Sequence, residues 1–425
     1  MDDRTAISWL GRRAGFGLRP GELDAAVALG VDAVVDQLID PDAHGVAAAP
    51  DPWTGLDLGF YRPGDPGASA QRQAVIRAWL DAMIATPRPL EEWMRWFWHG
   101  HFVSTLRTVK DAPLMVAQLR VFGQLGLADF RTLLRAVTVD PAMLLYLDGN
   151  TSHVDGVNEN FGREVLELFA LGIGSYSEDD VRAGATALTG WVVDRPGQSA
   201  TFRPGRHDGT AQNYLGRSAV HDVDSAVDAI VAHPSCAPFV SAKLAHAILG
   251  PQIDDGVLAD LARDFCASGL QLRPLVRSIL EAGLGGTTSS VVLAPVPWTI
   301  AAARSVGLDL SAAGRSPLKR LQAAGQVPMD APNVGGWPGG RAWLTSSGTL
   351  ARIATAGSLA AAAPTTGPAS RAAATGDFAA LADALGRPDG FSPATVAALQ
   401  SFGTRKQDGV GVLTVALASP DLEIA

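Results

Sequence analysis

Apolar residues recur at the spacing of an α-helix along most of this 425-residue chain, and this periodicity constrains the fold more than any other feature. Glycine and proline separate the periodic segments, as expected where one helix ends and another begins. Helices are predicted at 5–13, 20–29, 31–39, about 68–98, 114–127, 129–137, 157–172, 177–188, 223–232, 237–249, 255–267, 272–282 and 291–306, and the last ones between 378 and 417. The pattern therefore predicts a mainly α protein, a globular array of many helices.

Only one stretch predicts a β-sheet. Residues 189–203 place β-branched and aromatic residues on both sides of an Arg-Pro-Gly-Gln turn, which is typical of a small β-hairpin. Long irregular loops rich in glycine and proline are expected at 41–67 and 326–344. The second of these loops carries two tryptophans, so we interpret it as a packed, functional loop.

The length of the chain allows more than one structural unit. We expect residues 1–350 to form one large helical domain. We expect residues 351–425 to form a helical extension that packs on this domain, with an Ala/Thr/Pro-rich loop near 361–375.

Residues 157–172 predict one helix with a divided surface. At 100° per residue the apolar side chains form one stripe, whereas Asn160, Glu164 and Glu167 stack within a narrow arc on another side. Gly172 is placed to end the helix. An acidic face that meets water is the simplest interpretation of this pattern.

Other residues of the same segment suggest a further role. Glu159 and Arg163 are four residues apart and lie beside the polar arc, and Asn158 or Asn160 can cap the start of the helix. Because three glutamates share one arginine, the pattern suggests a cation, another arginine or a proton nearby. Both interpretations remain open at this point.

Two histidines follow a tryptophan-rich helical stripe. His99 and His101 would point about 200° apart on a helix but to the same side of an extended segment. Joint binding of a metal therefore requires the helix to end near Gly100. A second loop, which follows the predicted hairpin, presents His207 beside Asp208 and is suited either to a simple turn or to proton transfer.

Composition excludes several classes of protein. The net charge is −9 and Lys/Arg residues form no dense cluster, so nucleic-acid binding is not expected. The two cysteines, Cys236 and Cys266, lack metal-binding spacing and predict buried thiols. No apolar run is long enough to span a membrane. Since no export signal is visible, we expect a cytoplasmic protein, with an exported location left open.

Five motifs together resemble one bacterial family, known as domain of unknown function 1800. They are 10–17 (Leu-Gly-Arg-Arg-Ala-Gly-Phe-Gly), 98–102 (Trp-His-Gly-His-Phe), 158–169 (Asn-Glu-Asn-Phe-Gly-Arg-Glu-Val-Leu-Glu-Leu-Phe), 207–209 (His-Asp-Gly) and 332–340 (Pro-Asn-Val-Gly-Gly-Trp-Pro-Gly-Gly). The resemblance implies no settled biochemical activity. It implies, by analogy, a paired role with an alkaline-phosphatase-like protein partner. The chain departs from the family pattern in its Ala-rich C-terminal part and in lacking an export signal.

The first functional hypothesis is an enzyme, a hydrolase of a polar carbohydrate-like or ester substrate. In its sharper form, His99 and His101 bind one divalent metal with Glu164 or Glu167, and Arg163 holds an anionic substrate group. A metal-free form would use two carboxylates as acid and base, with tryptophans as sugar platforms. The residues assigned to catalysis are Glu159, Arg163, Glu164, Glu167, His207 and Asp208, and those assigned to substrate binding are Asn158, Asn160, Trp98, Asn333 and Trp337.

The second hypothesis is a helical scaffold or partner-binding protein. In it the same polar residues form a buried network that fixes helix packing. An open cleft lined by incompletely paired carboxylates would favour the enzyme, and a sealed, fully paired cluster would favour the scaffold.

Overall fold

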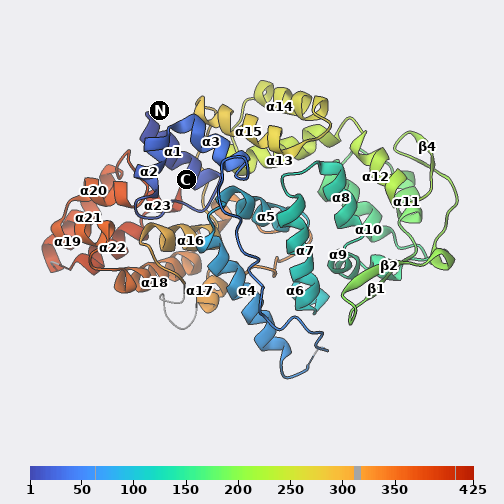
Figure 1. Ribbon diagram of the computed structural model, residues 1–425, viewed down its shortest axis with the longest axis horizontal. Helices are drawn as coiled ribbons and strands as arrows, with labels where there is room; N and C mark the ends of the chain where they lie inside the picture. Colours follow the sequence, from blue (N-terminus) through green and yellow to red (C-terminus); the bar gives the residue numbers. More distant parts are fainter. Residues whose placement is uncertain (63, 311–316, 407) are drawn as a thin grey trace.

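The computed structural model describes residues 1–62, 64–310, 317–406 and 408–425, and it confirms a mainly α-helical architecture (Figure 1). The α-helices are α1 (Asp3–Arg13), α2 (Glu22–Leu29), α3 (Val31–Ile39), α4 (Ala68–Ala85), α5 (Pro89–His101), α6 (Leu106–Val109), α7 (Ala112–Leu125), α8 (Phe130–Thr138), α9 (Pro141–Tyr146), α10 (Glu159–Glu164), α11 (Glu178–Ala187), α12 (Val223–Val231), α13 (Cys236–Leu249), α14 (Asp255–Ala267), α15 (Leu272–Leu284), α16 (Pro295–Ser305), α17 (Pro317–Ala323), α18 (Ser346–Ala362), α19 (Pro368–Thr375), α20 (Phe378–Ala384), α21 (Pro393–Lys406), α22 (Gly409–Leu417) and α23 (Pro420–Glu423). Short 3₁₀ turns are η1 (Gly149–Thr151), η3 (Pro204–Arg206) and η4 (Gly340–Trp343), and η2 (Val165–Ala170) is a π-helical segment.

Aspartate side chains start many of these helices. A carboxylate at the position before the first turn accepts a main-chain N–H that the helix itself leaves unpaired. This contact is made at α1, α7, α8, α9, α12, α14, α20 and α22 by Asp2, Asp111, Asp129, Asp140, Asp222, Asp254, Asp377 and Asp408. The turn chemistry of the sequence thus explains where the helices begin.

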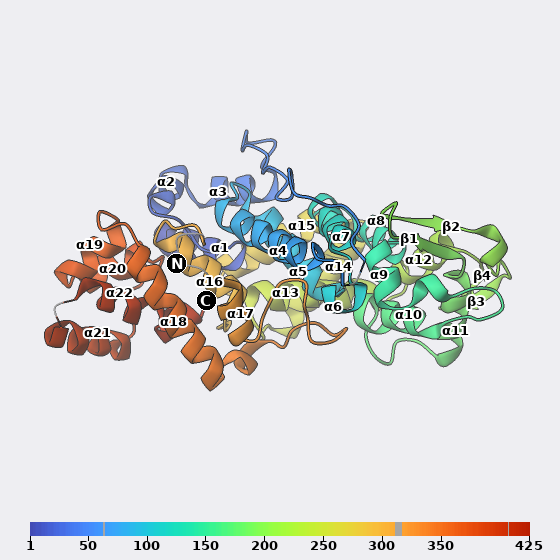
Figure 2. The same ribbon diagram turned by 90° about the horizontal axis from the view of Figure 1, so that it is seen from below.

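The helices form an elongated body (Figures 1 and 2). Helices α18–α23 lie at one end, α8–α12 and the strands lie at the other, and α5 and α7 lie between them. The start and end of the chain meet near α1, where the side chain of Arg13 donates to the main-chain oxygen of Ala425 at 2.6 Å. The middle of the molecule is therefore bounded by segments that are far apart in the sequence.

Two small antiparallel sheets are present in the described chain. Strands β1 (Trp191–Asp194) and β2 (Ser199–Phe202) form the predicted hairpin, with Trp191 opposite Phe202. The second pair, β3 (Gln212–Tyr214) and β4 (Arg217–Val220), was not predicted. Its strands are too short for alternation to be recognised in the sequence, and the buried Tyr214 packs against α11.

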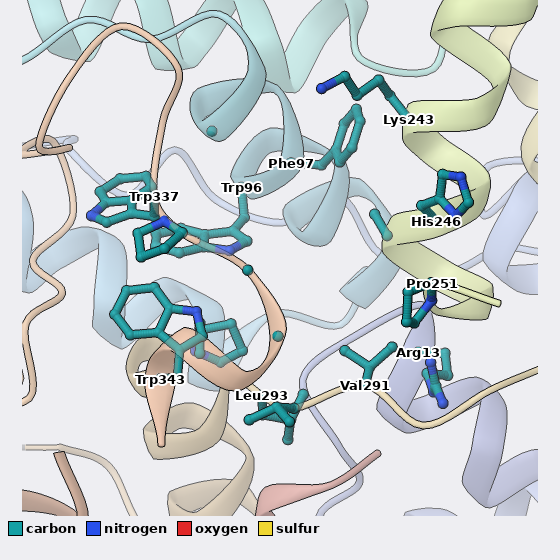
Figure 3. Close-up of a pocket in the computed structure, with 18 of the residues that line it drawn as sticks. Arg13, Trp96, Phe97, Lys243, His246, Pro251, Val291, Leu293, Trp337 and Trp343 are labelled. Atoms are coloured by element: carbon teal, nitrogen blue, oxygen red, sulfur yellow. The ribbon is translucent and has the colours of Figure 1, made fainter. Parts of the chain in front are cut away.

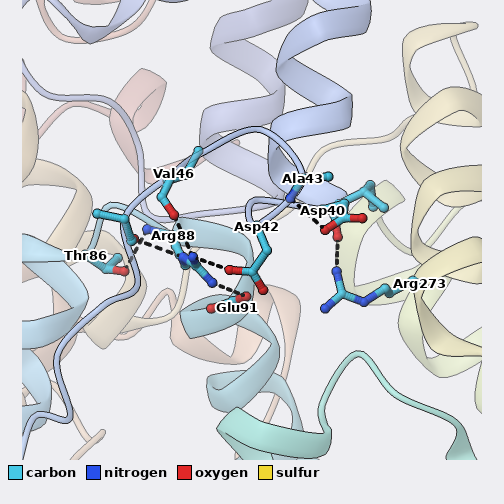
Figure 4. Close-up of polar contacts among 10 residues, drawn as sticks. Asp40, Asp42, Ala43, Val46, Thr86, Arg88, Glu91 and Arg273 are labelled. Carbon is cyan, nitrogen blue, oxygen red and sulfur yellow. Dashed lines mark hydrogen bonds and ion pairs between the residues drawn. The ribbon is translucent and has the colours of Figure 1, made fainter.

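The predicted irregular loop at 41–67 has no helix or strand in its described residues, and its first part is held by one arginine (Figure 4). Arg88 donates to the Asp42 carboxylate at 2.6 Å and to the main-chain oxygens of Val46 at 2.6 Å and Ala47 at 3.0 Å. The Arg88 side chain thus supplies hydrogen-bond partners to main-chain oxygens that are not part of a helix or sheet, and it holds the loop close to the start of α5.

In the C-terminal part, helix α18 (Ser346–Ala362) begins where the Thr345 hydroxyl caps it, and it spans residue 350, where the predicted domain and its extension meet. One expectation for this part was wrong. The expected loop near 361–375 is mostly helix α19 (Pro368–Thr375), since its alanines favour a helix once Pro368 has started it. The helices of this part pack on one another and on α16 and α17.

The described helices do not include one that combines the length and the apolar character needed to cross a membrane.

Candidate functional site

A large cleft opens in the middle of the molecule (Figure 3). Its volume is about 1380 Å³. Helix α5 contributes Trp93, Trp96, Phe97, Gly100 and His101, whose spacing places them on one helical face. The other walls come from the end of α1, from α13, and from the irregular segments 289–294 and 334–344. The cleft is thus assembled from segments that are far apart in the sequence.

Stacked aromatic rings form one wall of this cleft. The indoles of Trp96 and Trp337 lie 5.4 Å apart between ring centroids, with only 15° between their planes. The loop that carries Trp337 can approach α5 because Gly336 has a φ of +87°, and a Cβ at this position would lie 2.6 Å from the Gly100 carbonyl oxygen. Only glycine satisfies both conditions without strain. Gly336 therefore allows Trp337 to stack on Trp96.

The charged side chains that line the cleft are all basic. Arg12, Arg13, Lys243 and Arg341 line it, and no Asp or Glu side chain does so among the residues that the structure describes. The protein as a whole has a net charge of −9. This local excess of positive charge favours an anionic ligand.

His246 is the one exposed histidine of the cleft wall among the described residues. Its Nδ1 lies 3.2 Å from the main-chain oxygen of Gly250. In the tautomer that donates this bond, Nε2 keeps a free lone pair. The contact with Gly250 thus fixes the orientation of the ring in the wall of the cleft.

His99 and His101 lie on different sides of α5, because the helix continues through both residues. The helix ends at His101, close to Gly100, but both histidines still belong to it, and the two imidazoles diverge. His99 is fully buried behind the cleft wall, where its Nε2 accepts the main-chain N–H of Met329 at 3.0 Å. Burial lowers the pKa of His99 to about 3, so this ring is neutral.

His101 lines the cleft but is also held by the core. Its Nε2 lies 2.9 Å from the main-chain oxygen of Phe169, and its ring stacks on Phe97. Burial, together with the charge of Lys243, lowers the pKa of His101 to about 4. Nε2 must therefore carry the proton that it donates to Phe169, which leaves Nδ1 unprotonated.

The described residues contain no group of three or more His, Cys, Asp or Glu side chains that could hold a metal ion. In particular, the structure does not bring His99, His101 and Glu164 or Glu167 together as ligands. The first two side chains leave the helix in different directions, so they do not converge on one point.

The segment predicted as one helix consists of α10 followed by the π-helical turn η2. The Asn158 side chain caps it by accepting the N–H of Asn160 at 2.9 Å, and Gly172 follows it with a φ of +82°. The Asn160 side chain is exposed. The predicted start and end of this segment are confirmed.

Arg163 is paired on the surface of this segment. Its two terminal nitrogens each donate to the Glu178 carboxylate at 2.7 Å, and one of them lies 3.9 Å from Glu159. These hydrogen bonds raise its pKa further. Arg163 is therefore already occupied by carboxylates of the chain itself.

Glu164 and Glu167 lie outside the cleft lining, although Leu168 from the same segment reaches it. Glu167 accepts a hydrogen bond from the Tyr176 hydroxyl at 2.7 Å. Partial burial and, to a lesser extent, the nearby charge of Glu167 raise the pKa of Glu164. The two carboxylates thus form a separate acidic face.

The loop of His207 and Asp208 packs beside the β1–β2 hairpin, and neither residue lines the cleft. The imidazole lies between two main-chain oxygens, those of Thr189 at 3.1 Å and His221 at 2.8 Å. Hydrogen bonds from Thr210 lower the pKa of the Asp208 carboxyl. The structure thus gives both side chains a role in the turn.

Trp98 and Asn333, both predicted to bind substrate, do not line the cleft. Trp98 is fully buried, and its indole N–H donates to the Gly126 carbonyl at 2.9 Å, so a substrate has no access to it. The Asn333 side chain is exposed and accepts the N–H of Gly335 at 2.9 Å, which shapes the turn before Trp337. Among the predicted substrate-binding residues, Trp337 alone lines the cleft.

Sequence reasoning did not assign Arg12, Arg13, His246 and Arg341 to a site. The two adjacent arginines lie in the motif at 10–17, which is one of those that carry the family resemblance, and this motif could have indicated them as site residues. Arg341 directly follows the motif at 332–340, within the loop that was interpreted as functional, and this was its signal. His246 stands in a segment without a motif, and only the fold brings it to the cleft.

A family model described as "Protein of unknown function (DUF1800)" matches residues 9–424. The chain belongs to this family, as its motifs predicted. No curated protein and no solved structure gives a significant match.

Proposed function

We propose that the protein binds a polar, carbohydrate-like ligand in the central cleft. The observation that carries this proposal is the stacked pair of Trp96 and Trp337 in the wall of a cleft that also contains basic side chains. Flat aromatic faces pack well against sugar rings and other rings, and polar groups around them fix the orientation of a ligand. The volume of about 1380 Å³ accommodates a ligand of several rings.

We further propose that this ligand is a substrate for hydrolysis and that His246 acts as the general base. Supporting this role, Nδ1 of His246 lies 3.2 Å from the Gly250 oxygen, a contact that orients the ring and leaves Nε2 free toward a water molecule in the cleft. Proton transfer by an oriented histidine needs no metal. The carboxylates assigned to catalysis from the sequence, among them Glu164 and Glu167, lie outside the lining of this cleft.

The scaffold hypothesis predicts a fully paired polar cluster. Arg163 with Glu178 fits that description, but the basic side chains of the cleft do not. The cleft therefore favours ligand binding, and a role beside an alkaline-phosphatase-like partner stays a prediction.

A binding screen tests the proposal. Wild-type protein would be titrated with a panel of neutral and acidic oligosaccharides, and tryptophan fluorescence and calorimetry would report binding. We expect Trp337→Ala to weaken binding about tenfold or more and Trp337→Phe to retain most of it, because phenylalanine preserves a flat ring. Absence of any ligand for the wild type, or equal affinity in Trp337→Ala, would sink the proposal.

Turnover is tested separately on a ligand found in this way. His246→Gln should bind it with unchanged affinity and hydrolyse it at least about 100-fold more slowly, since a general base contributes 10²–10⁴ in rate. Unchanged turnover in His246→Gln would remove the assigned role while leaving the binding site intact.

A further inference from the structure

Arg12 and Arg13 end α1 and line the cleft, as Figure 3 shows for Arg13. Arg13 is only 5% exposed. A buried guanidinium loses its hydration, and proteins normally compensate for this cost with a carboxylate. The partners of these two arginines therefore indicate whether the pair serves the fold alone.

The other arginines of the described chain that are buried to this extent each reach a carboxylate. The pairs are Arg88 with Asp42 at 2.6 Å, Arg304 with Glu22 at 3.0 Å and Arg352 with Glu423 at 3.1 Å. Neither Arg12 nor Arg13 has an Asp or Glu side chain within 4.0 Å among the described residues. Arg13 is thus the exception among the buried arginines, and the half-buried Arg12 lies next to it in the sequence.

Main-chain oxygens take the place of an Asp or Glu carboxylate. Arg13 donates to the main-chain oxygens of Ile248 at 3.0 Å and of Ser289 and Ala425 at 2.6 Å each. The peptide carbonyls of Ile248 and Ser289 satisfy donors of the guanidinium but carry no net charge. Its Nε is buried and has no hydrogen-bond partner.

Arg12 shows the same pattern. One of its terminal nitrogens donates at 2.5 Å to both the Ser8 hydroxyl and the Gly386 carbonyl, and its Nε is also buried without a partner. Burial and the positive charge of Arg387 lower the pKa of both Arg12 and Arg13. The Asp389 carboxylate offsets part of this effect at Arg12 but is paired with Arg387 at 3.6 Å. Positive charge is therefore concentrated at this end of the cleft.

We propose that Arg12 and Arg13 form an anion subsite, so that the ligand of the cleft carries a phosphate, sulfate or carboxylate group in addition to its ring. Guanidinium groups bind such oxyanions through two parallel hydrogen bonds. Lys243 and Arg341 line the same cleft and add to the attraction for an anion. The link between this anion and a ring rests on the proposed function, whereas the anion subsite itself does not.

Inorganic phosphate and sulfate are the probes for the subsite. Each would be titrated into the full chain at constant ionic strength maintained with chloride, with the thermal midpoint and calorimetry as readouts. We expect a saturable rise in the midpoint that chloride does not produce. Identical midpoints in phosphate, sulfate and chloride would overturn the proposal.

Three variants locate the effect. Arg12→Gln should weaken phosphate binding about tenfold or more, and Arg12→Lys should retain a larger part of it because the charge remains. Arg263→Gln is the matched control, since Arg263 is an exposed arginine paired with Asp264 outside the cleft, and it should bind phosphate like the wild type. Unchanged binding in a folded Arg12→Gln protein would exclude this site.

A measurement on the wild type avoids the risk that Arg12→Gln does not fold. Crystals soaked in selenate should show an anomalous peak within hydrogen-bond distance of the Arg12 or Arg13 guanidinium. Selenate found only at other places would contradict the subsite. Phosphate binding at this position without any saccharide binding would leave the anion subsite standing and end the proposed function, so the two claims can fail separately.

Discussion

The acidic face of α10–η2 and the central cleft differ in how their charges are balanced. On the acidic face, Arg163 binds Glu178 and Glu167 accepts from Tyr176, so the chain supplies most of the partners. In the cleft, Arg12 and Arg13 donate to a hydroxyl and to main-chain oxygens and form no ion pair with an Asp or Glu side chain in the described part of the chain. The charged residues of the most recognisable motif thus pair mostly with other residues of the chain, whereas the excess of positive charge lies in a cleft assembled from distant segments. A charge that the chain itself does not balance is therefore a better sign of a ligand site than a recognisable motif is.

The core residue Trp98 and the cleft residue Trp337 should differ most in how far their substitution lowers the free energy of unfolding. Trp98→Ala should lower the free energy of unfolding by roughly 3–5 kcal/mol, because it empties a fully buried site and removes a hydrogen bond to Gly126. Trp337→Ala should cost clearly less, since Trp337 is only partly buried. Urea unfolding of both variants measures the difference. Equal losses would mean that Trp337 belongs to the core and not to a ligand site.

The two regions should also respond oppositely to pH. Since burial lowers the pKa of His101 to about 4, the unfolded chain binds this proton more readily, and stability is lost as the pH falls below about 6.5. We expect roughly 2–3 kcal/mol from His101 between pH 7 and pH 4.5. The raised pKa of Glu164 acts in the other direction, because its contribution is lost as the pH rises through its folded pKa.

Denaturant unfolding at several pH values checks this expectation. His101→Gln should reduce the loss of stability in acid, and Glu164→Gln should reduce the opposing loss as the pH rises. Parallel pH profiles for wild type and His101→Gln would show that this histidine is not buried in its neutral form.

The smallest effect is expected at the surface pair. Arg163→Gln should lower stability by less than about 1 kcal/mol, because exposed ion pairs contribute little. It should leave ligand binding in the cleft unchanged. Calorimetric titration of a saccharide found in the screen measures this, and a tenfold loss of affinity would move the site to the acidic face.

Local patterns predicted most of the helices, the hairpin at 189–203 and the glycine that ends the central segment, since each depends on residues close in sequence. The second sheet was missed because its strands span only Gln212–Tyr214 and Arg217–Val220. Helix α19 was missed because the Ala/Thr/Pro-rich composition of its segment was taken to indicate a loop.

The candidate site was harder to predict than the fold. Trp337 and Trp98 were both predicted to bind substrate. Trp337 lines the cleft, whereas Trp98 is buried in the core. His99 and His101 were predicted to bind one metal ion together, on the condition that α5 ends near Gly100. The sequence does not specify the last residue of a helix closely enough to decide whether both side chains belong to it. Long-range packing brings together Arg12, Lys243 and Arg341 in one cleft, and local sequence patterns do not predict such packing.

Hydrogen–deuterium exchange of the wild-type protein, with and without its best-binding saccharide, tests the central claim most directly. If the cleft is the ligand site, protection should appear in peptides covering 93–101, 243–252 and 334–344, with no change in 159–167. Protection confined to 159–167 would contradict the account and return the site to the acidic helix.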